Sequence, residues 1–345
     1  MKNGRGKFFV FVGLVIVVLG VSGFRVVGHA AEKDGMLEKY SGAIPHIFFH
    51  SLIVYPQKAA ADKKHFRLYR NDMITVERFK TILEEFYNNN FVLIDSRLLY
   101  SVDAQGKVRK ADVYVPKGKK PFVLSVDDLS YYSFMKDGGF ANKLVLDKGV
   151  VKTEVITPEG KTIVTDDGDV IPIVDRFIKE HPDFSLNGAK GIIAATGFEG
   201  ILGYRTQLAG DKGKREKDLV MPVVDALKKS GWIFASHSYG HQANFTYATI
   251  AAGTLAEDIQ LWKDQVEPLV GPTNIFIGPF GQTFREGDPR RTQLINAGFH
   301  VLYRVGADDY IKYYDNYVIM DRINIDGYRL RNSPNRLFRL FGWWL

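Results

Sequence analysis

Short apolar runs alternate along the chain with segments in which apolar residues recur at helical spacing. Eight of these runs have the length of a β-strand, and several are flanked by glycine or proline. They are residues 45–50, 91–95, 121–126, 191–196, 232–236, 274–278, 300–304 and 317–322. Continuous apolar runs are typical of parallel strands that are covered on both faces. The pattern therefore predicts an α/β protein built on a parallel sheet.

Helical patterns lie between many of the predicted strands. Thr75 is expected to cap the first of these helices, Thr254 and Glu257 form a capping box, and Gly231 is a typical helix end. The predicted helices span residues 75–90, 218–230, 254–266 and 288–297. About eight strands alternating with helices favour a closed or nearly closed barrel, in which active sites lie at the carboxyl ends of the strands.

One stretch departs from this alternation. Residues 144–170 contain VVKTEVIT, a turn at Pro158–Gly160 and then KTIVTDDGDV. This pattern predicts a β-hairpin inserted between a strand and the helix that follows it. Residues 59–70 and residues 101–120 are rich in polar side chains and are expected to be loops.

The amino terminus has the layout of an export signal. Lys2, Arg5 and Lys7 precede the apolar run Phe8–Phe24, and Gly28–Ala30 offers small residues for cleavage. The run is about as long as the shortest membrane-spanning helices, so a retained signal-anchor is an equal alternative to cleavage. In either case the positive-inside rule predicts an extracytoplasmic protein, secreted or anchored to the outer face of the cytoplasmic membrane.

Composition and charge narrow the function classes. Of 345 residues, 46% are hydrophobic, which excludes a wholly disordered chain, and the absence of cysteine excludes a disulfide scaffold and a thiolate metal site. The net charge of +7 comes from basic residues in the first 30 residues and in residues 329–345, which contain no acid. Residues 31–328, the expected barrel domain, are close to neutral, which argues against nucleic acid as a partner.

The tail at residues 329–345 mixes arginines with large apolar side chains. Two interpretations remain open. The tail either rests on a membrane surface or an anionic wall polymer, or it forms a last helix that packs on the barrel with its arginines in solvent.

Acids and histidines follow two of the predicted strands. Asp127 and Asp128 come directly after the run at 121–126, and His237 and His241 follow the run at 232–236. Two histidines four residues apart can bind one metal ion if the backbone turns helically there, and a carboxylate completes an open three-ligand site. Such a site suits metal-assisted hydrolysis, and the second acid is then free to act as a base.

These residues carry a resemblance to a known family. Ser125–Asp128 (SVDD) resembles the first motif of the polysaccharide deacetylases, the NodB-homology family or carbohydrate esterase family 4. His237–His241 (HSYGH) matches the second motif in full, and Ile277–Gly281 (IGPFG) resembles the third. The resemblance implies a distorted (β/α)7-type barrel and a divalent metal. It also implies removal of acetyl groups from N-acetylated sugars, and sometimes from O-acetylated ones.

The family roles transfer to this chain residue by residue. Asp127 would be the general base, and the metal ligands would be Asp128, His237 and His241. Pro279, Phe280 and Gly281 would line the substrate groove. Imidazole and carboxylate ligands suit Zn²⁺, and also Co²⁺, Ni²⁺ or Mn²⁺.

The chain also departs from the family pattern. Ile277 replaces the arginine of the third motif, and the late Leu-x-His motif that supplies the general acid has no match. Arg322 and Arg205 are candidates for the missing cation, and Arg205 is also expected among the substrate-binding residues. His50 is the candidate general acid. Each of these three also has a purely structural interpretation.

A competing first motif lies in the inserted hairpin. Thr165–Gly168 (TDDG) is closer in letters to the family consensus than the segment at Asp127 and Asp128 is. We favour Asp127 and Asp128 because they follow a fully apolar strand, whereas Asp166 and Asp167 follow an alternating hairpin arm, where acids and glycine usually form a plain turn.

The sequence therefore predicts an extracytoplasmic, metal-dependent hydrolase that removes acetyl groups from an N-acetylglucosamine-containing polysaccharide of the cell wall or cell surface. Two alternatives stay open. One is an O-acetyl esterase acting on acetylated glycans. The other is a membrane-tethered glycan-binding module on a catalytically weakened scaffold. If the leader is uncleaved, the membrane is a further partner.

Overall fold

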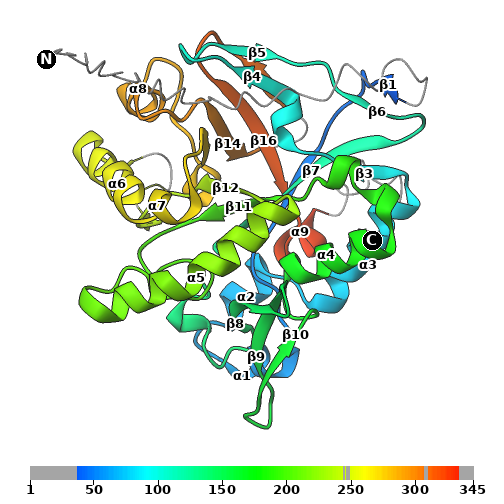
Figure 1. The fold of residues 1–345 in the computed structure, drawn as a ribbon, viewed down its shortest axis with the longest axis vertical. Coiled ribbons are helices and arrows are strands. Elements are labelled where there is room, and N and C mark those ends of the chain that lie inside the picture. The colour runs from blue at the N-terminus through cyan, green and yellow to red at the C-terminus, as the bar shows by residue number, and fades with distance from the viewer. Residues whose placement is uncertain (1–36, 244, 246–248, 307–309, 334–345) are drawn as a thin grey trace, which may run out of the picture.

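A computed structural model describes residues 37–243, 245, 249–306 and 310–333. Its centre is a closed barrel of parallel strands (Figure 1). The barrel strands are β2 (His46–Phe49), β7 (Lys120–Asp127), β11 (Ile192–Ala195), β12 (Ile233–Ser236), β13 (Ile275–Ile277), β14 (Val301–Val305) and β16 (Val318–Asn324). They pair in the order β11-β12-β13-β14-β16-β2-β7, and β7 pairs with β11 to close the ring. The predicted seven-stranded barrel is confirmed.

The eighth predicted strand lies outside the ring. β3 (Phe91–Leu93) pairs with the first part of β7, at Lys120–Phe122, while β11 pairs with the last part of the same edge. Because β11 needs only the carboxyl half of β7 to close the barrel, the amino half is left for β3. A short antiparallel strand, β15 (Ile311–Tyr313), extends the sheet from β16.

The barrel strands separate two apolar layers. Val123, Met320 and Tyr303 belong to a cluster inside the barrel. Their neighbours Leu124 and Ile319 belong to the large cluster between the strands and the helices. Side chains alternate across a strand, so every second residue points inward. The same alternation directs Asp127 and Arg322 into the barrel at its carboxyl end.

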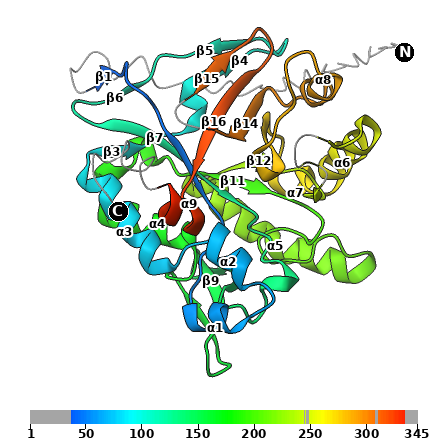
Figure 2. The same ribbon diagram turned by 180° about the vertical axis from the view of Figure 1, so that it is seen from behind.

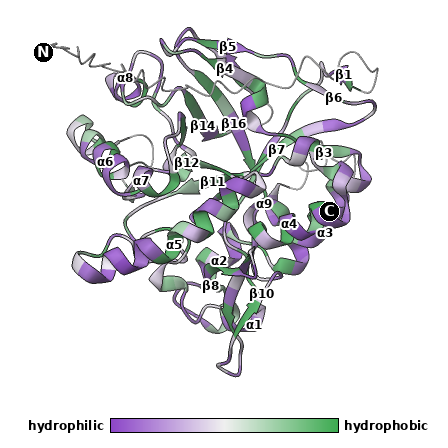
Figure 3. Cartoon of the chain, in the orientation of Figure 1, coloured by the Kyte–Doolittle hydropathy of each residue, from purple (hydrophilic) through white to green (hydrophobic). Residues whose placement is uncertain are grey.

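Helices surround the barrel (Figures 1 and 2). They are α3 (Val76–Asn88), α4 (Val170–Glu180), α5 (Gly210–Ser230), α6 (Ala252–Gln265), α7 (Glu267–Val270) and α8 (Pro289–Asn296). Thr75 caps α3 by accepting from the Arg78 amide, and Gly231 ends α5 with φ of 105°. The predicted capping box at Thr254 is wrong, because α6 begins at Ala252 and Thr254 lies inside it. Figure 3 shows that α5 carries long hydrophilic stretches.

Two segments that we expected to be loops contain regular structure. Residues 59–70 belong largely to α1 (Pro56–Ala61) and α2 (Phe66–Asp72). Each helix buries one residue, Ala59 or Tyr69, so an apolar period is hardly visible in the sequence. Residues 101–120 contribute to small antiparallel pairs. The strands are β4 (Tyr100–Val102), β5 (Val108–Lys110), and β6 (Tyr114–Pro116) with β1 (Leu37–Lys39).

The predicted insertion is a three-stranded antiparallel sheet between β7 and α4. Its strands are β8 (Ala141–Asp147), β9 (Val150–Ile156) and β10 (Thr162–Thr165). The expected hairpin corresponds to β9 and β10, and β8 adds a further strand on the other edge of β9.

The two ends of the chain are described only in part. The export segment at residues 1–30 lies outside the described residues. Of the tail at 329–345, only residues 329–333 are described. Residues 329–332 belong to the helix α9 (Gly327–Asn332), and residue 333 follows it. No helix in the described part of the chain is both long and apolar enough to cross a membrane.

Candidate metal-binding active site

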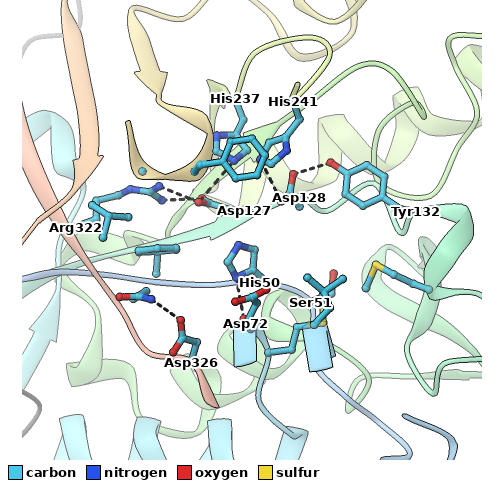
Figure 4. Close-up of a pocket in the computed structure, with 18 of the residues that line it drawn as sticks. His50, Ser51, Asp72, Asp127, Asp128, Tyr132, His237, His241, Arg322 and Asp326 are labelled. Atoms are coloured by element: carbon cyan, nitrogen blue, oxygen red, sulfur yellow. Dashed lines mark hydrogen bonds and ion pairs between the residues drawn. The ribbon is translucent and has the colours of Figure 1, made fainter. Parts of the chain in front are cut away.

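A pocket of about 510 Å³ opens at the carboxyl ends of the barrel strands. Figure 4 shows the acids and histidines that line it. They come from segments far apart in the sequence, namely the ends of β2, β7, β12 and β16, with α2 forming one wall. Barrel closure brings these ends together, so the pocket is a product of the tertiary fold.

The two acids after β7 occupy different environments. Asp127 is the last residue of the strand and is buried, whereas Asp128 has φ of 60°, so the chain turns sharply at that residue. The Tyr132 hydroxyl donates to Asp128 Oδ1 at 2.6 Å. The other oxygen, Asp128 Oδ2, lies 3.7 Å from His241 Nε2. Asp128 therefore faces the histidines, and Tyr132 fixes its rotation.

From the sequence, we expect a helical turn to bring the two histidines to one metal ion. The loop His237–His241 is not helical. Ser238 and His241 both have positive φ, and the Ser238 hydroxyl accepts from the His241 amide at 3.1 Å. The loop instead wraps around Asp258 of α6, which is buried. Asp258 accepts from the Ser238 hydroxyl and from the amides of Tyr239 and Gly240 at 2.8–3.0 Å. This carboxylate holds the loop in a conformation that aims both imidazoles into the pocket.

Asp128, His237 and His241 bring one ligand atom each to a common point, and these atoms all lie within 4.8 Å of one another. His237 Nδ1–H donates to the Ile277 carbonyl at 2.8 Å, which leaves the Nε2 lone pair for the site. Burial lowers the pKa of His237, so the ring is neutral and able to bind a metal at neutral pH. One carboxylate and two imidazoles fit a divalent metal with an open position.

Arg322 supplies the cation beside the second acid. Its guanidinium donates to both oxygens of Asp127, at 2.7 and 2.8 Å, and to the Ser125 hydroxyl at 3.0 Å. It is fully buried and lies 4.1 Å above the Phe48 ring. Burial acts to raise the pKa of Asp127, but the charge of Arg322 outweighs this effect, together with the charge that His237 gains at the low pH where the acid titrates, and the pKa lies below its usual value.

The pKa of Asp128 is also depressed. Burial acts to raise it, while His241, His237 and His50 and the Tyr132 hydrogen bond bring it down to about 2. Both acids of the pair are therefore ionised at neutral pH, as a metal ligand and a general base must be.

His50 lies across the pocket from the acid pair. Its Nδ1 contacts the Asp72 backbone carbonyl at 3.0 Å, and because a carbonyl only accepts, this nitrogen carries the proton. The ring lines the pocket, and in Figure 4 it lies between Asp72 and the two acids. The second ring nitrogen is therefore free to exchange a proton with a bound molecule.

The residues expected to bind substrate fall into two groups. Phe280 and Gly281 line the pocket, and the Phe280 ring is 47% exposed at the rim, 4.6 Å from His241. Pro279 is buried and is not among the lining residues. Arg205 is not among the lining residues, because its guanidinium donates to the backbone carbonyls of residues 130, 131 and 199. It orders the loop after Asp128 instead of facing a ligand.

The competing acids lie elsewhere. Asp166 pairs with Arg176 at 3.0 Å, and Asp167 pairs with Lys80 at 2.5 Å and Arg176 at 2.8 Å. Neither acid lines the pocket. The turn before α4 is thus an ion-paired surface feature.

Sequence reasoning missed three residues of the site. Tyr132 donates to Asp128, Ser125 accepts from Arg322, and Asp258 holds the histidine loop. A loop tyrosine and a strand serine carry no local signal. Asp258 lies at an apolar-side position of α6, and an acid on the buried side of a helix is a sign of a polar partner.

Comparison of the sequence with protein-family models and with curated proteins gives no match. Among solved structures, the chain is similar to one described as a de-N-acetylase from Aggregatibacter actinomycetemcomitans. The two are 15% identical with a TM-score of 0.49, over 86% of this chain and 99% of that one. It is also similar to the BpsB deacetylase domain from Bordetella bronchiseptica, at 10% identity and a TM-score of 0.31, over 61% and 74% of the two chains.

The strand pairing of the chain itself defines the class of fold, a distorted (β/α)7 barrel of the kind that the resemblance to the polysaccharide deacetylases predicts.

Proposed function

We propose that this protein is a divalent-metal-dependent hydrolase that removes acetyl groups from an N-acetylglucosamine-containing polysaccharide outside the cytoplasm. The observation that carries the proposal is the convergence of Asp128, His237 and His241 beside an Arg322-paired Asp127. Zn²⁺ is the ion we expect, given the ligand set. The extracytoplasmic location is supported by the pattern of residues 1–30, which predicts an export signal.

The chain's own residues would divide the proton transfers. Asp127 takes a proton from the attacking water as the water oxygen bonds to the acetamide carbonyl carbon. His50 gives a proton to the nitrogen as the carbon–nitrogen bond breaks, so that acetate and a free sugar amine are released. Arg322 keeps Asp127 ionised and fixed in one orientation. The divalent ion, when bound, supplies Lewis acidity that polarises the carbonyl and lowers the pKa of water.

The first test is acetate release from chito-oligosaccharides and from peptidoglycan, measured before and after chelation and after return of Zn²⁺. We expect activity that disappears with chelator. Asp128→Asn should lose bound metal and activity, whereas the matched variant Asp167→Asn should keep both, because Asp167 is paired on the surface. Acetate release that is independent of metal, or none from any such polymer, would refute the proposal.

The O-acetyl esterase alternative is tested at His50. An amine leaves only with a proton, whereas the alcohol of an ester is a better leaving group. We expect His50→Ala to lower N-deacetylation by ~10²–10⁴-fold, the usual contribution of a general acid, and to lower ester hydrolysis far less.

Faster wild-type turnover of O-acetylated than of N-acetylated glycans would favour the esterase. Glycan binding without turnover, preserved in Asp127→Asn, would favour a binding module.

A further inference from the structure

A second hollow region lies on the face formed by α2 and α9, beside the catalytic pocket. Two neighbouring cavities of about 480 and 380 Å³ share Phe66, Arg70 and Arg331. Arg78 lines the first and Arg67 the second, and neither cavity has an aspartate or glutamate in its wall. Figure 2 shows α2 and α9 side by side, and the two helices pack against each other.

The positive charge of this face is not neutralised within the described residues. No ion pair joins Lys64, Arg67 or Arg70 to a described carboxylate. Arg331 donates to the Arg70 carbonyl and to Asn71 Oδ1, both at 2.8 Å, and so connects α9 to α2. Both acceptors are uncharged, so the positive charge of Arg331 is not neutralised. An anion would therefore find several guanidinium donors free to bind it.

The same face exposes large apolar side chains. Phe66, which lines both cavities, is 39% exposed, and Tyr328, which lines the second, is 53% exposed. A polyanion in water, such as a phosphate-rich wall polymer, gains nothing from contact with these rings. An anionic bilayer meets both features, because phosphates bind the arginines while apolar side chains enter the boundary of the acyl region.

We infer that the α2–α9 face, made of Phe66, Arg67, Arg70, Tyr328 and Arg331, docks on the headgroups of an anionic phospholipid membrane. The sequence that follows α9 has the same chemistry: residues 334–345 contain two arginines and two tryptophans, which are enriched at membrane interfaces. The neighbouring side of α2 carries Leu68, which lines the catalytic pocket, and Met73 lines both that pocket and the first cavity. Docking would therefore hold the pocket mouth next to the membrane surface.

The test uses the absence of cysteine in the full chain. Asn332→Cys, at the edge of this face, and Ser101→Cys, on β4 at the far end of the molecule, are each labelled with a fluorophore (Figure 1). Both proteins are reconstituted with vesicles of phosphatidylcholine, with or without phosphatidylglycerol, that contain nitroxide-labelled lipid. We expect quenching at position 332 only, stronger with phosphatidylglycerol and weakened by salt.

The charge requirement is tested by Arg67→Gln/Arg70→Gln, with Arg109→Gln/Lys110→Gln on β5 as the control with the same charge change. At the usual contribution of a basic residue near an anionic membrane, the first pair should lower the docked-to-undocked ratio roughly 30-fold, and the control should leave it unchanged. Unchanged thermal unfolding midpoints exclude misfolding as the cause.

Equal quenching at positions 332 and 101, or quenching that ignores lipid charge, would overturn the inference. So would binding to an anionic wall polymer that needs Arg67 and Arg70 while position 332 stays unquenched, since the partner would then be the polymer. None of these readouts depends on acetate release. Membrane docking can therefore be confirmed or refuted independently of the proposed activity.

Discussion

Arg322 and Asp127 reach each other across the barrel interior from strands β16 and β7, which flank β2. Two charges so deeply buried are stable only as a pair, because each loses its water shell. The pair therefore constrains stability as well as chemistry. Its contribution can be separated from catalysis by measuring unfolding in the absence of substrate.

Arg322→Met is expected to destabilise the protein by about 3–5 kcal/mol at neutral pH, because it leaves the Asp127 carboxylate buried and unpaired. In the wild type the lowered pKa of Asp127 adds stability above pH 4, which is lost as the pH falls through the folded pKa. In the variant the sign reverses, since burial alone raises the pKa and the stability falls as the pH rises. Urea unfolding at several pH values measures both.

The control is the double variant Arg322→Met/Asp127→Asn, which removes the unpaired charge. It should be more stable than Arg322→Met alone at neutral pH. If the two variants unfold at the same urea concentration at neutral pH, the buried ion pair is not what Arg322 provides to stability.

Asp169 is a buried acid that the proposed chemistry does not use. It caps α4 and accepts from the amides of Val170 and Leu52, at 2.7 and 3.1 Å, and no basic side chain among the described residues acts on its pKa. Burial raises its pKa to about 6. The folded state thus holds this proton more tightly than the unfolded state, so the stability that Asp169 provides is present at low pH and declines as the pH rises from about 4 to about 6.

We expect Asp169→Asn to remove this decline, because an asparagine can still cap the helix but does not ionise. The stability of wild type relative to Asp169→Asn should fall by roughly 3 kcal/mol over that interval, at 1.36 kcal/mol for each pKa unit. Urea unfolding of both proteins between pH 4 and 8 measures it. Parallel curves would show that Asp169 does not titrate in this range.

At the scale of elements, the histidine loop depends on a neighbouring helix. β12 delivers the loop to the barrel end, but α6 sets its conformation through Asp258. Support of this kind typically changes metal affinity without touching the metal.

Asp258→Asn is expected to lower the affinity for Zn²⁺ or Co²⁺ by ~10–100-fold, because an amide group cannot accept all three hydrogen bonds of the carboxylate. Titration with Co²⁺ followed by its visible absorption measures affinity and ligand geometry together. Asp264→Asn, an exposed acid on the same helix, is the control and should bind like wild type. Unchanged affinity in Asp258→Asn would show that the loop holds its shape without this carboxylate.

At the scale of the molecule, charge is distributed differently in space than along the chain. The sequence places the basic surplus at the two ends and leaves residues 31–328 nearly neutral. In the folded protein, basic residues from 64–70 and from α9 meet on one face, because α2 packs against α9. The net charge of a stretch of sequence cannot reveal a basic face that is built from two segments far apart in the chain.

From the sequence alone we could predict the barrel strands, the insertion, and the residues whose ligand atoms converge. Apolar runs and alternation report burial, which is local, and the spacing of HSYGH is a local property as well. The remaining features follow from how the elements pack in three dimensions. The strand order leaves β3 outside the ring and brings Arg322 next to Asp127. The backbone of α2 holds His50 opposite the acids, and Arg205 donates to backbone carbonyls instead of facing the pocket. These choices depend on contacts between residues far apart in the chain, for which no local pattern carries a signal.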